Sequence, residues 1–183
     1  MTYFTSRDIA AIALFAALWS VLSAYIAPIF WRATHLPFLC DMLGVISLIL
    51  VLWQVRKFGA VTLTGIIATI ITLALNPYAT HFFGFTAASI VFDVLARLIG
   101  YKSCLEKPVL SIISLLSVST ISTAVAGTII GFIFMNPNFL ATMFGGVAFF
   151  AVLHAAGGII GGVVGLTLIR ALSTRISTPK VKT

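Results

Sequence analysis

The sequence predicts an all-α membrane protein with six transmembrane helices and both termini in the cytoplasm. The first observation is composition: 61% of the 183 residues are hydrophobic and 8% are charged, whereas a soluble domain has roughly 25% charged residues. The second is the length of the apolar runs, each close to or longer than the roughly 20 residues that a spanning helix needs. The third is the uneven distribution of basic residues among the loops. Disorder is excluded, because disordered chains are polar and charged.

Six apolar runs follow one another along the chain. The first is expected to be a mature helix with Ser6 as its N-cap, because its apolar core is longer than that of a signal peptide. Proline closes the third run at Pro77 and lies near the first turn of the fifth at Pro108, where it is tolerated. The sixth run exceeds the bilayer thickness, which predicts tilt or an extension into the cytoplasm. The predicted spans are residues 8–29, 36–55, 58–75, 82–101, 109–135 and 139–172.

The runs are predicted to be helices rather than barrel strands. Membrane-spanning strands are about 10 residues long and alternate in polarity, and these runs do neither. In hydrocarbon, backbone hydrogen bonds must be satisfied inside a helix or a closed barrel. Residues 1–172 are therefore predicted to form one domain, followed by a short basic cytoplasmic tail over residues 173–183.

The charge distribution predicts the orientation. Eleven Lys and Arg against four Asp and Glu give a net charge of +7, and basic residues collect on the cytoplasmic side of membrane proteins. The predicted outer loops carry only Arg32, so both ends of the chain are assigned to the cytoplasm and no nucleic-acid partner is expected. The basic residues assigned to the inner side are Arg7, Arg56, Lys57, Arg97, Lys102, Lys107, Arg170, Arg175, Lys180 and Lys182.

Sequence motifs for common catalytic and metal sites are absent. The chain has no G-x-x-x-x-G-K-[ST] phosphate loop, no H-E-x-x-H zinc motif and no G-x-S-x-G nucleophile motif. Cys40 and Cys104 match neither a metal-ligand spacing nor a disulfide framework. We therefore expect a protein that is not an enzyme and holds neither a metal nor a cofactor.

Ionisable residues inside the predicted spans are candidates for function, because an unpaired charge in lipid is costly. Asp93 and Arg97 have the i, i+4 spacing of a structural ion pair, with a proton relay as the alternative. Asp41 either pairs with the first outer loop or faces a ligand. His154 either bonds a neighbouring helix or lines a pocket.

Small residues form stripes on the first and last runs. Ala10, Ala13 and Ala17 fall on one helical face, which either packs inside the bundle or docks another subunit, since small residues allow close helix approach in lipid. The last run has a similar glycine stripe, which either packs inside the bundle or forms a sliding or docking surface. Its members are Gly157, Gly158, Gly161, Gly162 and Gly165.

Two segments carry a family resemblance. One is D-I-A-A-I-A-L-F-A-A-L-W over residues 8–19, which contains the motif Ala13-x-x-x-Ala17. The other is V-R-K-F-G-A over residues 55–60, followed by an apolar helix that ends at Asn76-Pro77. With these segments the chain resembles the S component, the substrate-binding membrane subunit, of energy-coupling factor (ECF) vitamin transporters. It is most similar to the thiamine or hydroxymethylpyrimidine type, and size and span number agree over nearly the whole chain.

The resemblance implies a function in the cytoplasmic membrane of a prokaryote. An S component binds a small water-soluble vitamin or precursor outside the cell and delivers it with a membrane T component and two cytoplasmic ATPase subunits. Ala13 and Ala17, with Ala10 on the same face, would contact the T component. The first outer loop is short for a gating lid, so the loop between the last two runs is expected to share that role.

A pocket for a flat ligand is expected to combine stacking rings with a few orienting polar groups. The candidate substrate-binding residues are Trp31, Arg32, His35, Asp41, Asn76, Tyr78, His81, Phe85, Asn136, Asn138 and His154. One alternative is an intramembrane enzyme, which requires Asp93, Arg97 and His154 to converge in one wet cavity. The other is a structural assembly subunit, which has no enclosed polar pocket near the outer side.

Overall fold

The computed structural model describes residues 3–174, and this part of the chain is helical without any strand. The prediction of an all-α fold is therefore confirmed. The elements are α1 (Ser6–Tyr25), α2 (Ala27–Thr34), α3 (Phe38–Val55), α4 (Ala60–Leu75), α5 (Phe82–Ile99), α6 (Tyr101–Leu105), α7 (Pro108–Ile129), the π-helical turn η1 (Ile130–Phe134), α8 (Pro137–Phe144) and α9 (Val147–Ser173).

Most of these helices have the length and composition of membrane spans. Within residues 3–174, five stretches are long and apolar enough to cross a membrane: Ser6–Thr34, Phe38–Val55, Phe82–Ile99, Pro108–Phe134 and Val147–Ser173. Helix α4 is also apolar but has only 16 residues, about 24 Å at 1.5 Å per residue, against a hydrocarbon core of about 30 Å. This set of helices fits a multi-pass membrane protein.

The start of α1 is capped one residue earlier than predicted. Thr5, rather than Ser6, is the N-cap: its hydroxyl accepts from the backbone N–H of Asp8 at 3.3 Å, and the Asp8 carboxylate accepts from the N–H of Thr5 at 2.8 Å. This reciprocal pair is a capping box. Asp8 also forms a salt bridge with Lys57, whose Nζ lies 2.7 Å from Oδ2. This contact connects α1 to the segment between α3 and α4.

The last predicted span is two helices rather than one. The run over residues 139–172 is interrupted at Gly145 and Gly146, whose φ angles are +68° and +115°. Residues with a side chain rarely adopt such angles, so the two glycines allow the chain to leave α8 and begin α9 in a new direction. Helix α8 is thus a short separate helix, and α9 alone has the length of a span.

Helices α3, α7 and α9 pack through glycines of α9. An added Cβ at Gly161 would lie 2.9 Å from the backbone Cα of Met42 in α3, and one at Gly162 would lie 2.9 Å from Leu116 in α7. Gly165 faces Ile49 of α3 equally closely. The glycine stripe therefore serves packing inside the bundle, the first of the two readings of this stripe. Helices α4 and α1 pack against each other, as do α4 and α5.

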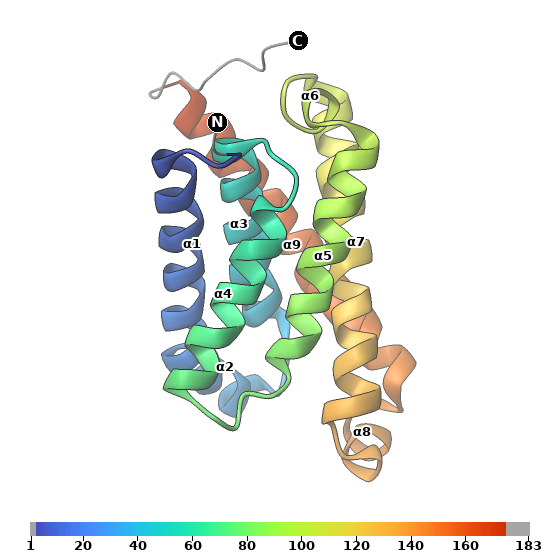
Figure 1. Cartoon of the computed structure of the whole chain (residues 1–183). Helices are drawn as coiled ribbons and strands as arrows, with labels where there is room; N and C mark the ends of the chain where they lie inside the picture. The colour runs from blue at the N-terminus through green and yellow to red at the C-terminus, as the bar shows by residue number, and fades with distance from the viewer. Residues whose placement is uncertain (1–2, 175–183) are drawn as a thin grey trace.

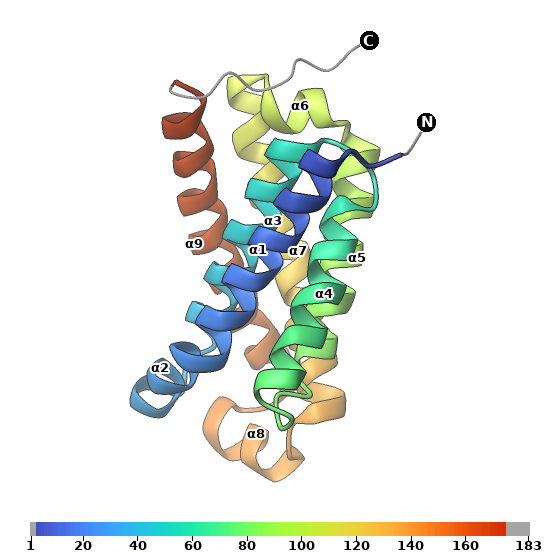
Figure 2. The same ribbon diagram turned by 60° about the vertical axis from the view of Figure 1, so that its left-hand side comes forward.

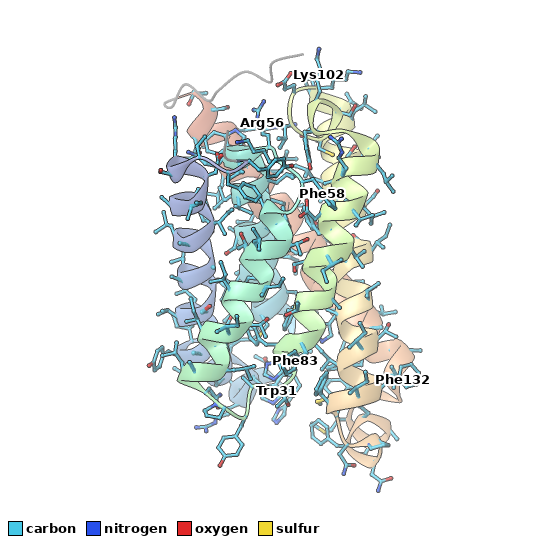
Figure 3. The ribbon with its side chains drawn as sticks, viewed as in Figure 1. Trp31, Arg56, Phe58, Phe83, Lys102 and Phe132 are labelled. Atoms are coloured by element: carbon cyan, nitrogen blue, oxygen red, sulfur yellow. The ribbon has the colours of Figure 1, made fainter. Side chains whose placement is uncertain are left out.

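The two ends of the bundle differ in charge. Figures 1 and 2 both place α2 and α8 at one end and α6 at the other, together with the first turn of α1 and the last turn of α9. Figure 3 shows Arg56 and Lys102 at the α6 end and Trp31 at the α2 end. Of the described basic residues only Arg32, in α2, belongs to the α2 end. Arg175, Lys180, Lys182 and most of the predicted tail lie outside the described residues.

Candidate ligand pocket

A pocket of about 370 Å³ lies at the α2 end of the bundle. This volume is within the range of small-molecule sites. Its walls come from the ends of α1, α3 and α5, from α2 and the 76–81 loop, and from η1, α8 and the first turns of α9. The lining residues are Ser23, Ala27, Pro28, Trp31, Pro37, Cys40, Asn76, Ala79, His81, Phe82, Phe85, Ile130, Met135, Phe139, Phe150 and His154.

Aromatic rings form much of the pocket wall. The ring centroids of Phe82 and Phe85 are 5.3 Å apart, and those of Phe150 and His154 are 4.7 Å apart in an edge-to-face arrangement. Phe85 joins these two pairs, because its centroid lies 6.0 Å from that of His154. These distances are typical of favourable aromatic contacts. A flat ligand entering this space would meet ring faces and edges from α5 and α9.

A buried hydrogen bond fixes His154 beside the pocket. Its Nδ1 lies 2.9 Å from Oδ1 of Asp41, and both side chains are almost wholly buried. Among the described residues, neither His154 Nε2 nor Asp41 Oδ2 has a hydrogen-bond partner. A carboxylate that holds one imidazole nitrogen orients the other nitrogen, so Nε2 is the nitrogen of His154 that this contact leaves without a partner.

Two glycines make room for this pair. An added Cβ at Gly127 of α7 would lie 2.8 Å from Cβ, Cγ and Cδ2 of His154. An added Cβ at Gly157 of α9 would lie 2.8 Å from Cβ and Oδ2 of Asp41. Real Cβ atoms do not approach that closely, so a side chain at either position would displace the hydrogen-bonded pair.

Five of the predicted ligand-binding residues line the pocket: Trp31, Asn76, His81, Phe85 and His154. Asp41 does not line it but lies behind His154, which answers both questions left open for these two residues. Asp41 bonds α9 rather than the first outer loop, and His154 both bonds a neighbouring helix and lines the pocket.

The other five predicted residues do not line the pocket. Asn136 instead caps α8, with its side-chain oxygen accepting from the N–H groups of Asn138 and Phe139. Tyr78 is 91% exposed, and His35 ends α2 in the left-handed conformation. The residues that the structure places outside the pocket wall are Arg32, His35, Tyr78, Asn136 and Asn138.

Most of the residues missed by the sequence prediction are apolar. Phe82, Phe139, Phe150 and Met135 line the pocket although no polar group marks them. One sequence signal was available: Phe82 and Phe85 are three residues apart and Phe150 and His154 four apart, so each pair shares a helical face. That spacing places Phe82 on the same face as the predicted residue Phe85, and Phe150 on the same face as the predicted residue His154.

The ion pair predicted between Asp93 and Arg97 is not formed in the described residues. Oδ2 of Asp93 instead accepts from the N–H of Gly59 at 2.9 Å, the N–H of Thr62 at 3.0 Å and the hydroxyl of Thr62 at 2.9 Å. Arg97 is exposed. The physical reason is that the first turn of α4 presents N–H donors without helical partners, and the carboxylate binds them in place of the exposed guanidinium.

Asp93, Arg97 and His154 do not converge in one cavity. Asp93 contacts the start of α4, near the α6 end, whereas His154 contacts Asp41, Phe85 and Phe150 at the pocket. Residues 3–174 also hold no group of three or more His, Cys, Asp or Glu that could hold a metal ion.

The alanine stripe of α1 is accessible on the bundle surface. Ala10 and Ala13 are exposed and Ala17 is partly buried, while Ala11 and Ala16 on the opposite face are buried. No described helix covers the first of these faces fully, so lipid or another subunit can contact it.

The histidine at the start of α5 is uncharged at neutral pH. Burial, with a smaller contribution from nearby His154, lowers the pKa of His81 from 6.5 to about 4. Its ring lies edge-on to those of Phe82 and Phe85, at centroid distances of 5.5 and 6.4 Å. This side chain therefore adds polarity to the pocket wall without adding positive charge.

Comparison with known proteins does not assign a family. No protein-family model, no curated protein and no solved structure matches this chain.

Proposed function

We propose that the chain is the substrate-binding subunit of an ECF-type importer in a prokaryotic cytoplasmic membrane. It would capture a small water-soluble vitamin or precursor outside the cell, with thiamine or hydroxymethylpyrimidine as the leading candidates. A T component and two cytoplasmic ATPase subunits would then drive delivery. The family resemblance of residues 8–19 and 55–77 suggested this function, and the aromatic pocket is the observation that carries it.

The proposed topology has six spans and cytoplasmic termini. Helices α1 and α2 together form the first span, α4 is the short third span, and α8 lies at the outer surface. The charge difference between the two ends supports this orientation, because basic residues favour the cytoplasmic side. The pocket at the α2 end then faces the outside, where a nutrient is captured.

The pocket has the properties that capture of a flat vitamin requires. Its volume of about 370 Å³ suits a small heterocyclic compound. The rings of Phe82, Phe85 and Phe150 provide stacking surfaces, while Asn76 and His154 provide polar atoms for orientation. An assembly subunit has no need of such a pocket, and an enzyme using Asp93, Arg97 and His154 would need them together.

Capture can be tested by mass spectrometry of small molecules that co-purify with the protein. We expect one compound to be retained by the wild type and lost in Ala79→Phe, because Ala79 lines the pocket and is buried. The matched control is Ala74→Phe, an exposed position at the end of α4, which should retain the compound. Absence of any retained compound, or retention in Ala79→Phe, would argue against this pocket as the capture site.

Delivery can be tested separately by uptake in cells that also contain the T component and ATPases. Ala17→Arg should abolish uptake and preserve ligand binding if the Ala10, Ala13 and Ala17 face docks the T component. Val163→Arg places the same charge on a 49% exposed position of α9 and controls for the cost of arginine in lipid. Equal uptake by the two variants would contradict docking through α1.

A further inference from the structure

The pocket wall contains no lysine or arginine. Its titratable members are Cys40, His81 and His154. The apolar surroundings keep His81 neutral, as its lowered pKa of about 4 indicates. Arg32 directly follows the pocket-lining residue Trp31 in the sequence, but its side chain is exposed and does not line the pocket. No fixed positive charge is therefore available to neutralise an anionic ligand inside the pocket.

An acidic side chain is hydrogen-bonded to the pocket-lining residue His154. Asp41 is buried in α3, and the one hydrogen bond of its side chain within the described residues goes to His154. With Asp41 ionised, the pair has a net charge of −1 when the imidazole is neutral and of zero when it is protonated. A positive net charge would require Asp41 to lose its own charge beside a charged imidazole, which a hydrogen-bonded carboxylate opposes.

Burial makes this charge effective at the pocket. The Asp41 and His154 side chains are 0% and 3% exposed, so water screens their field far less than at a surface. An anion in the pocket would be desolvated without a counter-charge, and a buried unpaired charge is costly. An uncharged or cationic ligand meets no such penalty.

Two polar atoms of the wall lack a hydrogen-bond partner among the described residues. Ser23 Oγ lines the pocket and has no hydrogen-bond partner among the described residues, as is true of His154 Nε2. Each can bind an amine, amide or hydroxyl group of a ligand. Ser23 Oγ carries no charge, and a positive charge on the His154 imidazole would already be balanced by the Asp41 carboxylate to which it is hydrogen-bonded.

We propose that the pocket selects its ligand by charge: it binds flat aromatic compounds that are uncharged or cationic and discriminates against carboxylates and phosphates. Asp41 sets this selectivity through His154, which stands between it and the ligand. The inference rests on the proposed capture function and narrows its substrate class. A phosphorylated form of a vitamin would therefore be a poor ligand compared with the free form.

Three probes with one ring and different charges test the selectivity. Benzamidine is a cation, benzamide is neutral and benzoate is an anion, and saturation-transfer NMR measures their binding to the full chain in nanodiscs. We expect benzamidine and benzamide to bind at least about tenfold more tightly than benzoate, the effect of one uncompensated charge near a buried carboxylate. This comparison needs no variant.

A variant pair then assigns the selectivity to Asp41. Asp41→Asn keeps the shape and a hydrogen-bond acceptor for His154 but removes the charge, so the preference for benzamidine over benzoate should fall about fivefold or more. Asp8→Asn removes a carboxylate at the α6 end and should leave the preference unchanged.

The outcomes separate this inference from the proposed function. Benzoate binding as tightly as benzamidine, or an unchanged preference in a folded Asp41→Asn protein, would overturn charge selection while leaving ligand capture intact. Failure of all three probes to bind would count against both, because a ligand pocket of this kind should accept a small aromatic ring.

Discussion

Nδ1 of His154 lies 2.9 Å from Oδ1 of Asp41, joining α9 to α3 across 113 residues of sequence. The bond is buried, and it leaves Nε2 as the His154 nitrogen without a hydrogen-bond partner among the described residues. Glycines at 127 and 157 leave the space that the pair occupies. The pocket and the packing of the last helix therefore depend on the same contact.

The Asp41–His154 bond should contribute measurably to stability. A double-mutant cycle with Asp41→Ala and His154→Ala should give a coupling of about 1–2 kcal/mol, the upper part of the range for hydrogen bonds between membrane helices. Denaturation in mixed micelles of mild detergent and SDS provides the free energies of unfolding. If the changes in the free energy of unfolding caused by the two substitutions simply add, the contact does not contribute to stability.

Side chains on the inner stripe of α9 should be poorly tolerated. In Gly161→Ala the new methyl group meets the backbone of α3 at Met42, which cannot rotate away, so we expect a loss of about 1–3 kcal/mol from overpacking. Ile160→Ala, at a 43% exposed position on the same helix, is the control and should cost less. The same unfolding assay ranks the two, and equal stability of Gly161→Ala and wild type would refute close packing at this position.

Substitution of Asp93 should lower the stability of the protein much more than substitution of Arg97. Asp93→Ala removes the acceptor of three hydrogen bonds at the start of α4, and leaving such donors unpaired costs about 1–3 kcal/mol. Arg97→Ala at an exposed site should change stability by less than about 0.5 kcal/mol. Comparable losses in both variants would instead indicate the ion pair that their spacing suggests.

Stability should fall in mildly acidic solution because of His81. The folded protein holds the pKa of this side chain at about 4, below its ordinary value of 6.5, so between these pH values the unfolded chain binds a proton that the folded chain does not. Above pH 6.5 His81 is neutral in both states and causes no loss of stability. As the pH falls from 6.5 to about 4, protonation of the unfolded chain progressively lowers the free energy of unfolding. Melting temperatures of His81→Gln should therefore depend less on pH there than those of wild type, while exposed His35→Gln should follow wild type.

Hydropathy alone was enough to predict the helical class and the approximate positions of the long helices. These features depend on local composition, since each span must satisfy its backbone internally. The separation of α8 from α9 was missed because Gly145 and Gly146 stand inside an apolar run that already contains several glycines. Their positive φ angles, rather than their identity, distinguish them from the packing glycines at 157 to 165.

The candidate site was predictable only in part, for a related reason. Sequence marks polar residues in outer loops, and His81 and Asn76 indeed line the pocket. It does not show which helices are neighbours, so the pairing of Asp41 with His154 could not be derived. For Asp93, the i, i+4 spacing to Arg97 was the visible signal, whereas the stronger partners lay in the distant first turn of α4.

The first turn of α1 and the last turn of α9 lie at the same end of the bundle, away from the pocket (Figure 1). A reporter domain joined ahead of Thr5, which keeps the cap of α1, or after Ser173 would be attached at the end of the bundle opposite the ligand entrance. Purification tags, surface-immobilisation handles and a donor–acceptor fluorophore pair can thus be attached at both ends of one molecule without interfering with ligand-binding assays.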